Sequence, residues 1–176
     1  MRYLLSLLAL AVLVGCQSNP VNVDYDTRAD FSTFNQYAWA EDACRTEPLM
    51  CDRVKSALTS GLAGRKMTYS KEQPDFLVRY WVRNATDEQD DRPRSSVGIG
   101  GGSGGVGMGV SLGIPLGAPK RKIEVVIEFV SPSDQHLQWQ GIRKDGISAK
   151  GKPDEITAEV ARIVGEILSQ FPPGKK

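Results

Sequence analysis

The sequence contains little histidine, little cysteine, no excess of charge of one sign and no apolar run long enough to cross a bilayer. His136 is the single histidine, and the three cysteines are Cys16, Cys44 and Cys51. The 22 basic residues nearly balance the 21 acidic ones, which argues against a nucleic-acid-binding protein because such proteins carry a basic excess or stripe. The apolar run from Leu4 to Val14 covers about 11 residues, whereas a spanning helix needs roughly 20. With 40% hydrophobic residues, the composition is otherwise that of an ordinary folded protein.

What the N-terminus does contain is a short apolar run that ends in a cysteine. Arg2 precedes the apolar run, and the run ends in Leu13-Val14-Gly15-Cys16, the order of a signal-peptide core followed by a cleavage site. A small residue directly before cysteine resembles the lipobox of bacterial lipoproteins, in which the sulfur receives a diacylglycerol. We therefore expect residues 1–15 to be a signal peptide that is removed, and residues 16–20 to be the lipidated Cys16 and a short tether. The alternative is an ordinary buried cysteine beside a retained apolar helix.

The expected anchor sets the compartment. Gln17 follows Cys16, and because an aspartate there resembles the signal for inner-membrane retention, its absence favours the outer membrane with the body facing the periplasm. Removal of residues 1–15 takes away one basic residue, Arg2, and leaves a formally neutral body. A polybasic lipid-binding domain would carry a basic excess, so the net charge does not predict one. No cofactor is expected other than the covalent lipid.

Once Cys16 is assigned to lipid, Cys44 and Cys51 remain as a pair. In the oxidising periplasm a disulfide is the expected state of two nearby cysteines. Closing a loop of about eight residues stabilises the fold by roughly 2.5 kcal/mol in the chain-entropy treatment. A redox or metal-binding pair is the alternative, but the spacing is wider than CxxC and His136 lies far away in sequence. We therefore expect a structural disulfide and no metal site.

Hydrophobic periodicity predicts the fold class. Apolar residues recur every three or four positions from Pro48 to about Leu62 and from Asp154 to Phe171, which predicts two amphipathic helices. Besides an N-terminal strand, alternation of apolar and polar residues predicts strands at 36–40, 76–82, 123–130 and 136–142. This order indicates an α+β two-layer sandwich, a mainly antiparallel sheet of about five strands covered on one face by two helices. We expect one domain, residues 21–173, with a Gly-rich insertion at 95–117.

The alternation also assigns the faces of the strands. In the strand at 123–130, Ile123 and every second residue after it would face the core, whereas Glu124 and Glu128 would face water. In the strand at 136–142, Trp139 would face the core and His136 would be solvated.

Ser131, Ser133 and Asp134 lie near His136 in the sequence, which raises the possibility of a catalytic triad. These residues have the composition of a hairpin turn, and adjacent turn residues rarely satisfy the geometry of nucleophile, base and orienting group. We expect no catalytic residue and no enzymatic activity.

The segment from Ser95 to Gly117 is about half glycine, and no GKS or GKT follows it, so it does not match a phosphate-binding loop. Apolar residues occupy every second position of its second half: Val106, Met108, Val110, Leu112, Ile114 and Leu116. As a strand, this pattern would have one apolar face and one nearly bare face. Two interpretations remain open: a mobile insertion that partly covers the sheet, and an apolar interaction arm for a partner or bilayer.

Charged residues flank this insertion on both sides. Acidic residues precede it and basic residues follow it: Asp87, Glu88, Asp90, Asp91, Lys120, Arg121 and Lys122. If the strands on either side are antiparallel neighbours, the two groups would face each other at the base of a long hairpin. Exposed ion pairs contribute only ~0–1 kcal/mol each, and a solvated charge run is the alternative.

Five short motifs occur in order along the chain: Val23-Asp24-Tyr25-Asp26, Asp30-Phe31-Ser32-Thr33-Phe34, Tyr37-Ala38-Trp39, Pro74-Asp75-Phe76-Leu77-Val78 and Phe171-Pro172-Pro173. With the Gly-rich centre, their order and spacing resemble the bacterial lipoproteins grouped as domain of unknown function 4136 (DUF4136). The resemblance covers nearly all of the mature chain. It implies a secreted, lipid-anchored α+β domain of unassigned activity, and it transfers no catalytic or binding residue. We expect the aromatic residues of these motifs to pack on the core, the alternative being a surface that stacks on carbohydrate or peptidoglycan.

The function that these patterns favour is structural or protein-interaction work at the periplasmic face of the outer membrane. The expected partners are the membrane, through the lipid anchor, and an envelope protein, but not nucleic acid. A binding module for a small apolar or cell-wall ligand, held between the uncovered sheet face and the Gly-rich arm, is the second hypothesis. An envelope hydrolase is the third.

Overall fold

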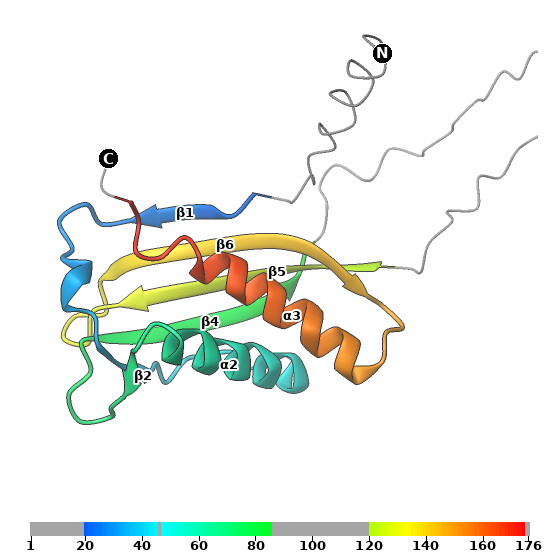
Figure 1. Cartoon of the computed structure of the whole chain (residues 1–176), viewed down its shortest axis with the longest axis horizontal. Coiled ribbons are helices and arrows are strands. Elements are labelled where there is room, and N and C mark those ends of the chain that lie inside the picture. Colours follow the sequence, from blue (N-terminus) through cyan, green and yellow to red (C-terminus); the bar gives the residue numbers. More distant parts are fainter. Residues whose placement is uncertain (1–19, 46, 86–119, 175–176) are drawn as a thin grey trace, which may run out of the picture.

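The computed structural model describes residues 20–45, 47–85 and 120–174. One six-stranded sheet has the order β1-β6-β5-β4-β2-β3, and two helices lie along one of its faces (Figure 1). The elements are β1 (Asn22–Tyr25), the 3-10 helix η2 (Phe31–Thr33), β2 (Gln36–Trp39), α2 (Pro48–Ala63), β3 (Thr68–Tyr69), β4 (Phe76–Asn84), β5 (Lys120–Val130), β6 (Leu137–Ser148) and α3 (Pro153–Leu168). This open sheet with a helical layer confirms the predicted α+β class.

Several predicted features lie outside the described residues: the signal peptide, Cys16, the Gly-rich insertion and the acidic group that precedes it. Within the described residues, none of the helices has both the length and the apolar character needed to cross a membrane.

The centre of the sheet consists of three long antiparallel strands. β4 pairs with β5 from Leu77 opposite Val130 to Asn84 opposite Ile123, and β5 pairs with β6 along nearly all of its length. β2 runs parallel to both β3 and β4, so the sheet is mixed. Parallel neighbours need a crossover connection, and α2 provides it after β2. The strand that the sequence did not predict is β3. It has two residues, too few for an alternation of apolar and polar residues to appear.

The helix-covered face of β5 is the core face, as its alternation predicts, with Ile123, Ile127 and Phe129 fully buried. The prediction that the opposite face is wet is wrong for its carboxylates. Glu124 and Glu128 are each only 7% exposed, because long side chains from β4 and β6 flank them and satisfy their charges, as described below. A central strand can therefore bury both faces when its neighbours carry complementary charges.

The two helices begin close to the predicted positions. Each has a proline in its first turn, where the missing N–H costs nothing. α3 was expected to continue to Phe171 but ends at Leu168. The chain leaves the helix there because the Phe171 ring packs in the core, where it is 4% exposed.

Two glycines set the close approach of the layers. A Cβ at Gly61 would lie 2.5 Å from a methyl carbon of Leu168, and a Cβ at Gly141 would lie 2.5 Å from Ile167 Cγ2. Real Cβ atoms do not come this close, so a side chain at either position would require the buried side chains of Leu168, or of Ile167 and Trp139, to move. The bare glycines therefore allow α3 to contact both α2 and the sheet directly.

Candidate functional site

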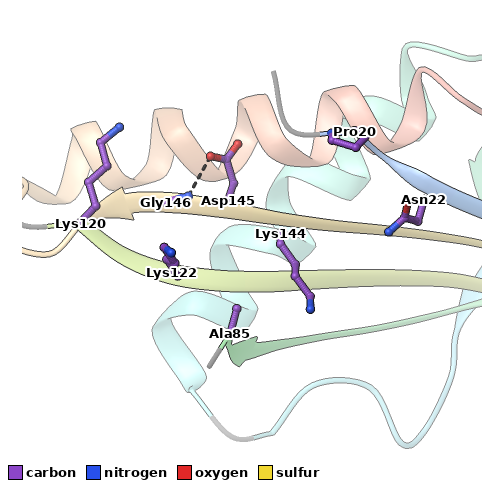
Figure 2. A pocket seen from close by; sticks show the side chains of 8 residues that line it. All are labelled: Pro20, Asn22, Ala85, Lys120, Lys122, Lys144, Asp145 and Gly146. Carbon is purple, nitrogen blue, oxygen red and sulfur yellow. Dashed lines mark hydrogen bonds between the residues drawn. The ribbon is translucent and has the colours of Figure 1, made fainter. Parts of the chain in front are cut away.

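Three points at which the described chain ends or resumes lie at one end of the sheet, here called the tether end. Pro20, Ala85 and Lys120 line a single hollow of about 560 Å³, the tether-end pocket (Figure 2). Its full lining is Pro20, Asn22, Ala85, Lys120, Lys122, Lys144, Asp145 and Gly146. The expected lipid anchor and the expected apolar arm are therefore both joined to the body at this end.

Strand register places the three lysines of the pocket on one face. Lys120 and Lys122 are two residues apart on β5, and Lys122 lies opposite Gly146 of β6. Lys144, two residues before Gly146, has the same orientation because strand side chains alternate. The bare Gly146 leaves room for the stem of Lys120, whose Cδ would lie 3.2 Å from an added Cβ. The lysines thus surround a floor that has no side chain of its own.

The carboxylate in the pocket lining, Asp145, is bound by other groups. Its Oδ2 atom lies 3.0 Å from Arg143 and 2.8 Å from Arg162, and its Oδ1 atom accepts from the Gly146 N–H at 2.8 Å. Burial opposes ionisation of Asp145, but the hydrogen bonds from Arg162, Gly146 and Arg143 outweigh it and lower its pKa. Asp145 is therefore ionised at neutral pH and already balanced by arginines.

Arg143 itself is 3% exposed, on the helix-covered face, and its Nη1 atom lies 2.6 Å from Glu166 of α3. Arg162 also contacts Glu166, at 3.0 Å. A charged network thus joins α3 to β6, and a further polar contact between them is the Ser148 N–H, which donates to Glu159 Oε2 at 2.8 Å.

The uncovered face of the sheet consists of cross-strand rows. One row joins Arg83, Glu124 and Lys144: Arg83 binds Glu124, and Lys144 Nζ lies 3.6 Å from the same carboxylate. A second row joins Arg79, Glu128 and Gln140: the Glu128 carboxylate lies 3.4 Å from Arg79 and 2.6 Å from Gln140.

Between these rows lies an apolar one, in which Val126 is paired with Trp81 and Ile142. Leu77, Val130 and Leu137 form a further apolar row at the other end of these strands. The face therefore alternates charged rows with apolar ones. It differs from the broad apolar surface that the small-ligand hypothesis would require.

A second hollow, of about 790 Å³, lies at the opposite end of the sheet. It is lined by Tyr25, Thr27, Ala29, Asp30, Phe31, Ser32, Pro172, Pro173 and Gly174. The rings of Tyr25 and Phe31 meet edge to face with centroids 6.1 Å apart. Most of the expected aromatic set packs on the core, and these two residues also form part of this hollow.

The predicted disulfide is present. The sulfurs of Cys44 and Cys51 are bonded, and the two Cα atoms are 5.6 Å apart. Cys51 is buried in the first turns of α2, and the Cys44 N–H donates to Tyr80 O on β4 at 2.9 Å. The bond therefore fastens the start of α2 to the segment that runs beside β4.

His136 is half-exposed, as expected, although β6 begins one residue after it. Its Nε2 atom lies 3.0 Å from Asp26 Oδ2. Hydrogen bonds from the Arg28 side chain and backbone, then from His136, hold the pKa of Asp26 well below its usual range. Ser131 contacts Ser133, with 3.0 Å between the hydroxyl oxygens, and its side chain also hydrogen-bonds Asp134, which lowers the pKa of that carboxyl.

Two further sequence expectations concern a metal site and the apolar arm. Among residues 20–45, 47–85 and 120–174, no three or more histidine, cysteine, aspartate or glutamate side chains gather in a way that could hold a metal ion. The arm residues from Val106 to Leu116 lie outside the described part of the chain. Sequence reasoning identified Lys120 and Lys122 only as part of a basic group after the insertion, and it missed both Lys144 and the pocket that these lysines share. The alternation of Lys120 and Lys122 at the start of a strand was the available signal, whereas Lys144 joins them only through strand register.

A family model described as a domain of unknown function (DUF4136) matches residues 21–173. The chain belongs to the DUF4136 family. No curated protein matches this DUF4136 chain in sequence.

Two solved structures share its fold. A DUF4136 family protein from Bacteroides thetaiotaomicron aligns at a TM-score of 0.51 and 12% identity, over 88% of this chain and 96% of that one. A PDZ domain protein from Parabacteroides distasonis aligns at a TM-score of 0.56 and 11% identity, over 90% of this chain but only 36% of that one. At these identities the likeness concerns the fold alone.

Proposed function

We propose that this DUF4136 chain is a periplasmic lipoprotein of the outer membrane, anchored through a lipid on Cys16, whose body has a structural or protein-interaction role rather than a catalytic one. The lipobox-like Leu13-Val14-Gly15-Cys16 supports the anchor. The Cys44–Cys51 disulfide suits an oxidising compartment. The family carries no assigned activity that would favour a different function.

The observation that carries the proposal is the convergence at the tether end. The chain resumes at Pro20, leaves the described body at Ala85 and resumes again at Lys120, all around one pocket. Pro20 lies four positions after Cys16, and four residue steps of extended chain span at most ~14 Å. A lipidated Cys16 would therefore hold this end near the membrane and leave the opposite end facing the periplasm.

The test is a pair of N-terminal variants. Cys16→Ser should leave uncleaved precursor or soluble protein, because one buried methylene contributes ~0.8 kcal/mol and the acyl chains supply the whole attachment. Gln17→Asp is the matched control: lipidation should persist, and the protein should move from the outer-membrane to the inner-membrane fraction. Density separation of membranes and intact mass measure both outcomes. A Cys16→Ser protein with the parent's mature mass and membrane fraction would exclude the anchor.

The second candidate function is binding of a small cell-wall ligand, and the hollow beside Tyr25 and Phe31 favours it. Aromatic rings on a concave surface can stack on sugar or peptide groups, and this hollow lies at the end remote from the tether. Titration of the protein with soluble peptidoglycan fragments should perturb the amide resonances of residues 27–32. Perturbation that persists unchanged in a Phe31→Ser variant would argue against binding at these rings.

A further inference from the structure

We propose that the Cys44–Cys51 disulfide is a thiol–disulfide exchange site, which a protein dithiol opens by attack on the Cys44 sulfur. The first turn of α2 would then be held or released according to the redox state of the compartment. This inference goes beyond the anchor and the interaction role proposed above, and it does not require a lipid on Cys16. The disulfide remains structural while it is oxidised, and the inference adds that it can be opened in the folded protein.

The disulfide borders a surface hollow rather than lying sealed in the core. Both cysteines line this hollow, which has a volume of about 390 Å³. Cys44 is partly exposed, whereas Cys51 is only 4% exposed. A thiolate that enters the hollow should therefore meet the Cys44 sulfur, and the Cys51 sulfur should be the one that is displaced.

The position of Cys51 suits a displaced sulfur. It is the fourth residue of α2, and the positive end of a helix stabilises a thiolate. The sulfur whose thiolate is more stable is displaced faster in thiol–disulfide exchange. Burial of Cys51 opposes the charged form, so the groups around the hollow have to favour it.

The charged groups that line the hollow favour thiolates on balance. Arg45 and Lys55 line it, against one carboxylate, that of Asp52. Lys55 follows Cys51 by one helical turn, and its Nζ atom lies 5.3 Å from the centre of the Trp39 ring. Attraction between the ammonium and the ring keeps the charge beside the hollow. Nearby cations stabilise both the attacking thiolate and the departing one.

The exchange proceeds in two balanced steps. The first thiolate of the dithiol attacks Cys44 Sγ, and the bond to Cys51 breaks with its electron pair on the Cys51 sulfur, which leaves a mixed disulfide on Cys44. The second thiolate of the dithiol then attacks the sulfur of the first and displaces Cys44 as a thiolate. Two electrons pass from the dithiol to the disulfide, and two protons complete the two cysteine thiols.

Reduction should loosen the start of α2 without unfolding the body. The segment before the helix stays on β4, because the Cys44 N–H donates to Tyr80 O at 2.9 Å. Further along α2, Val54 and Leu58 are fully buried. The disulfide joins these two separately held parts. Its loss should therefore release the first turn of the helix and leave the later turns in place.

The experiment uses the oxidised full-length protein in neutral detergent micelles. The probes are thioredoxin as the protein dithiol, dithiothreitol as a small dithiol, and a thioredoxin variant whose second active-site cysteine is serine, which stops at the mixed disulfide. Thioredoxin should reduce the disulfide faster than dithiothreitol at the same concentration. Peptide mapping should find the trapped variant on Cys44. After reduction, amide hydrogen exchange should quicken at residues 49–52 and stay unchanged at residues 56–62.

A charge variant tests the hollow itself. Lys55→Gln should slow reduction by thioredoxin about two- to fivefold, the range that one exposed charge supplies. Lys71→Gln, which removes the same charge at another exposed position, is the matched control and should react as the parent does. An equal rate in Lys55→Gln and the parent would remove the hollow's charge from the proposal and so overturn it.

Four other results would overturn the proposal: trapping on Cys51, reduction only after denaturation, dithiothreitol as fast as thioredoxin, or faster hydrogen exchange throughout the sheet. The third result would mean that the sulfurs are exposed but not recognised. Intact mass reports lipidation of Cys16 separately, so a missing anchor and a missing exchange site are distinguishable.

Discussion

The two ends of the sheet differ in what holds them together. At the end remote from the tether, six rings pack against one another in a cluster that we call the aromatic end: Phe31, Phe34, Phe76, Phe129, Trp139 and Phe171. At the tether end, lysines surround a hollow floored by glycine. Aromatic burial and ring contacts are large stabilising contributions, whereas exposed charges contribute little. Stability is thus concentrated at one end, which leaves the other free to carry surface contacts.

Loss of an aromatic ring should give the largest effect. Phe171 meets Phe129 edge to face with centroids 4.8 Å apart and Trp139 with centroids 5.4 Å apart. Phe171→Ala should destabilise the protein by about 4 kcal/mol through lost burial and the cavity left behind. The thermal midpoint should fall by roughly 8–16 °C. Tyr69→Ala, at an exposed ring, is the control and should change the midpoint little. A Phe171→Ala midpoint close to the parent's would show that the aromatic end is not where stability is concentrated.

The buried charge network is the next largest test, because it lies on the core side of the tether end. Arg143→Ala leaves Asp145 and Glu166 with fewer partners, and breaking a buried pair costs about 3 kcal/mol. Urea unfolding at neutral pH measures this loss. The free energy of unfolding should fall less in Arg143→Ala than in Phe171→Ala if the aromatic end contributes more stability than the tether end.

The pH dependence of stability provides a control for the charged network around Asp145. Because the pKa of Asp145 is lowered in the folded protein, its ionised form stabilises the fold at neutral pH. That contribution is lost as the pH falls below the ordinary aspartate value of about 3.9 and through the folded-state pKa. Arg143→Ala removes one of the groups that lower the pKa, so the acid-induced loss should shrink. An identical pH profile in parent and variant would mean that Arg143 does not stabilise the charged form.

The disulfide should contribute somewhat less. Replacing Cys44 and Cys51 together by alanine releases a loop of about eight residues, which costs roughly 2.5 kcal/mol in the chain-entropy treatment. Chemical denaturation of the double variant, beside the parent with and without reductant, measures it. The reduced parent and the variant should agree, and a stability equal to that of the oxidised parent would remove the disulfide from the account of how α2 is held.

The elements with strong periodicity were predictable from the sequence, and so was the disulfide. α2, α3 and β5 each have an apolar repeat that matches their secondary structure, and cysteine parity with the expected compartment indicated the Cys44–Cys51 bond. The parallel placement of β2 beside β4 was not predictable, because alternation defines a strand but not its neighbour. The two-residue β3 has no pattern of its own.

The candidate site was less predictable because it depends on register. Lys120 and Lys122 share a face by alternation alone. Lys144 joins them only because β6 pairs with β5 in one particular register. The burial of Glu124 has the same origin, since its partners, Arg83 and Lys144, come from the two neighbouring strands. Residues that act across strands are therefore visible only after the sheet has been assembled.

The smallest effect on stability should come from deleting residues 97–116 and joining the flanks by a short turn. β4 and β5 still pair at Asn84 and Ile123, and the Ala85 N–H donates to Lys122 O at 3.1 Å, so the two strands already lie side by side where they leave the described body. Loop-closure entropy changes by only about 0.6 kcal/mol per doubling of length, so the thermal midpoint should move by a few degrees at most.

The result of this deletion also decides between the two interpretations of the apolar arm. A fall in midpoint beyond about 15 °C would mean that residues such as Val106 and Leu116 fill part of the core, since each apolar side chain buried contributes ~1.5–3 kcal/mol and each kcal/mol moves the midpoint by ~2–4 °C. Crosslinking in intact cells followed by mass spectrometry supplies the second measurement. A deletion variant that stays folded and membrane-bound but loses its crosslinked partners would place the protein-interaction role in the arm. A variant that keeps them would place that role outside residues 97–116.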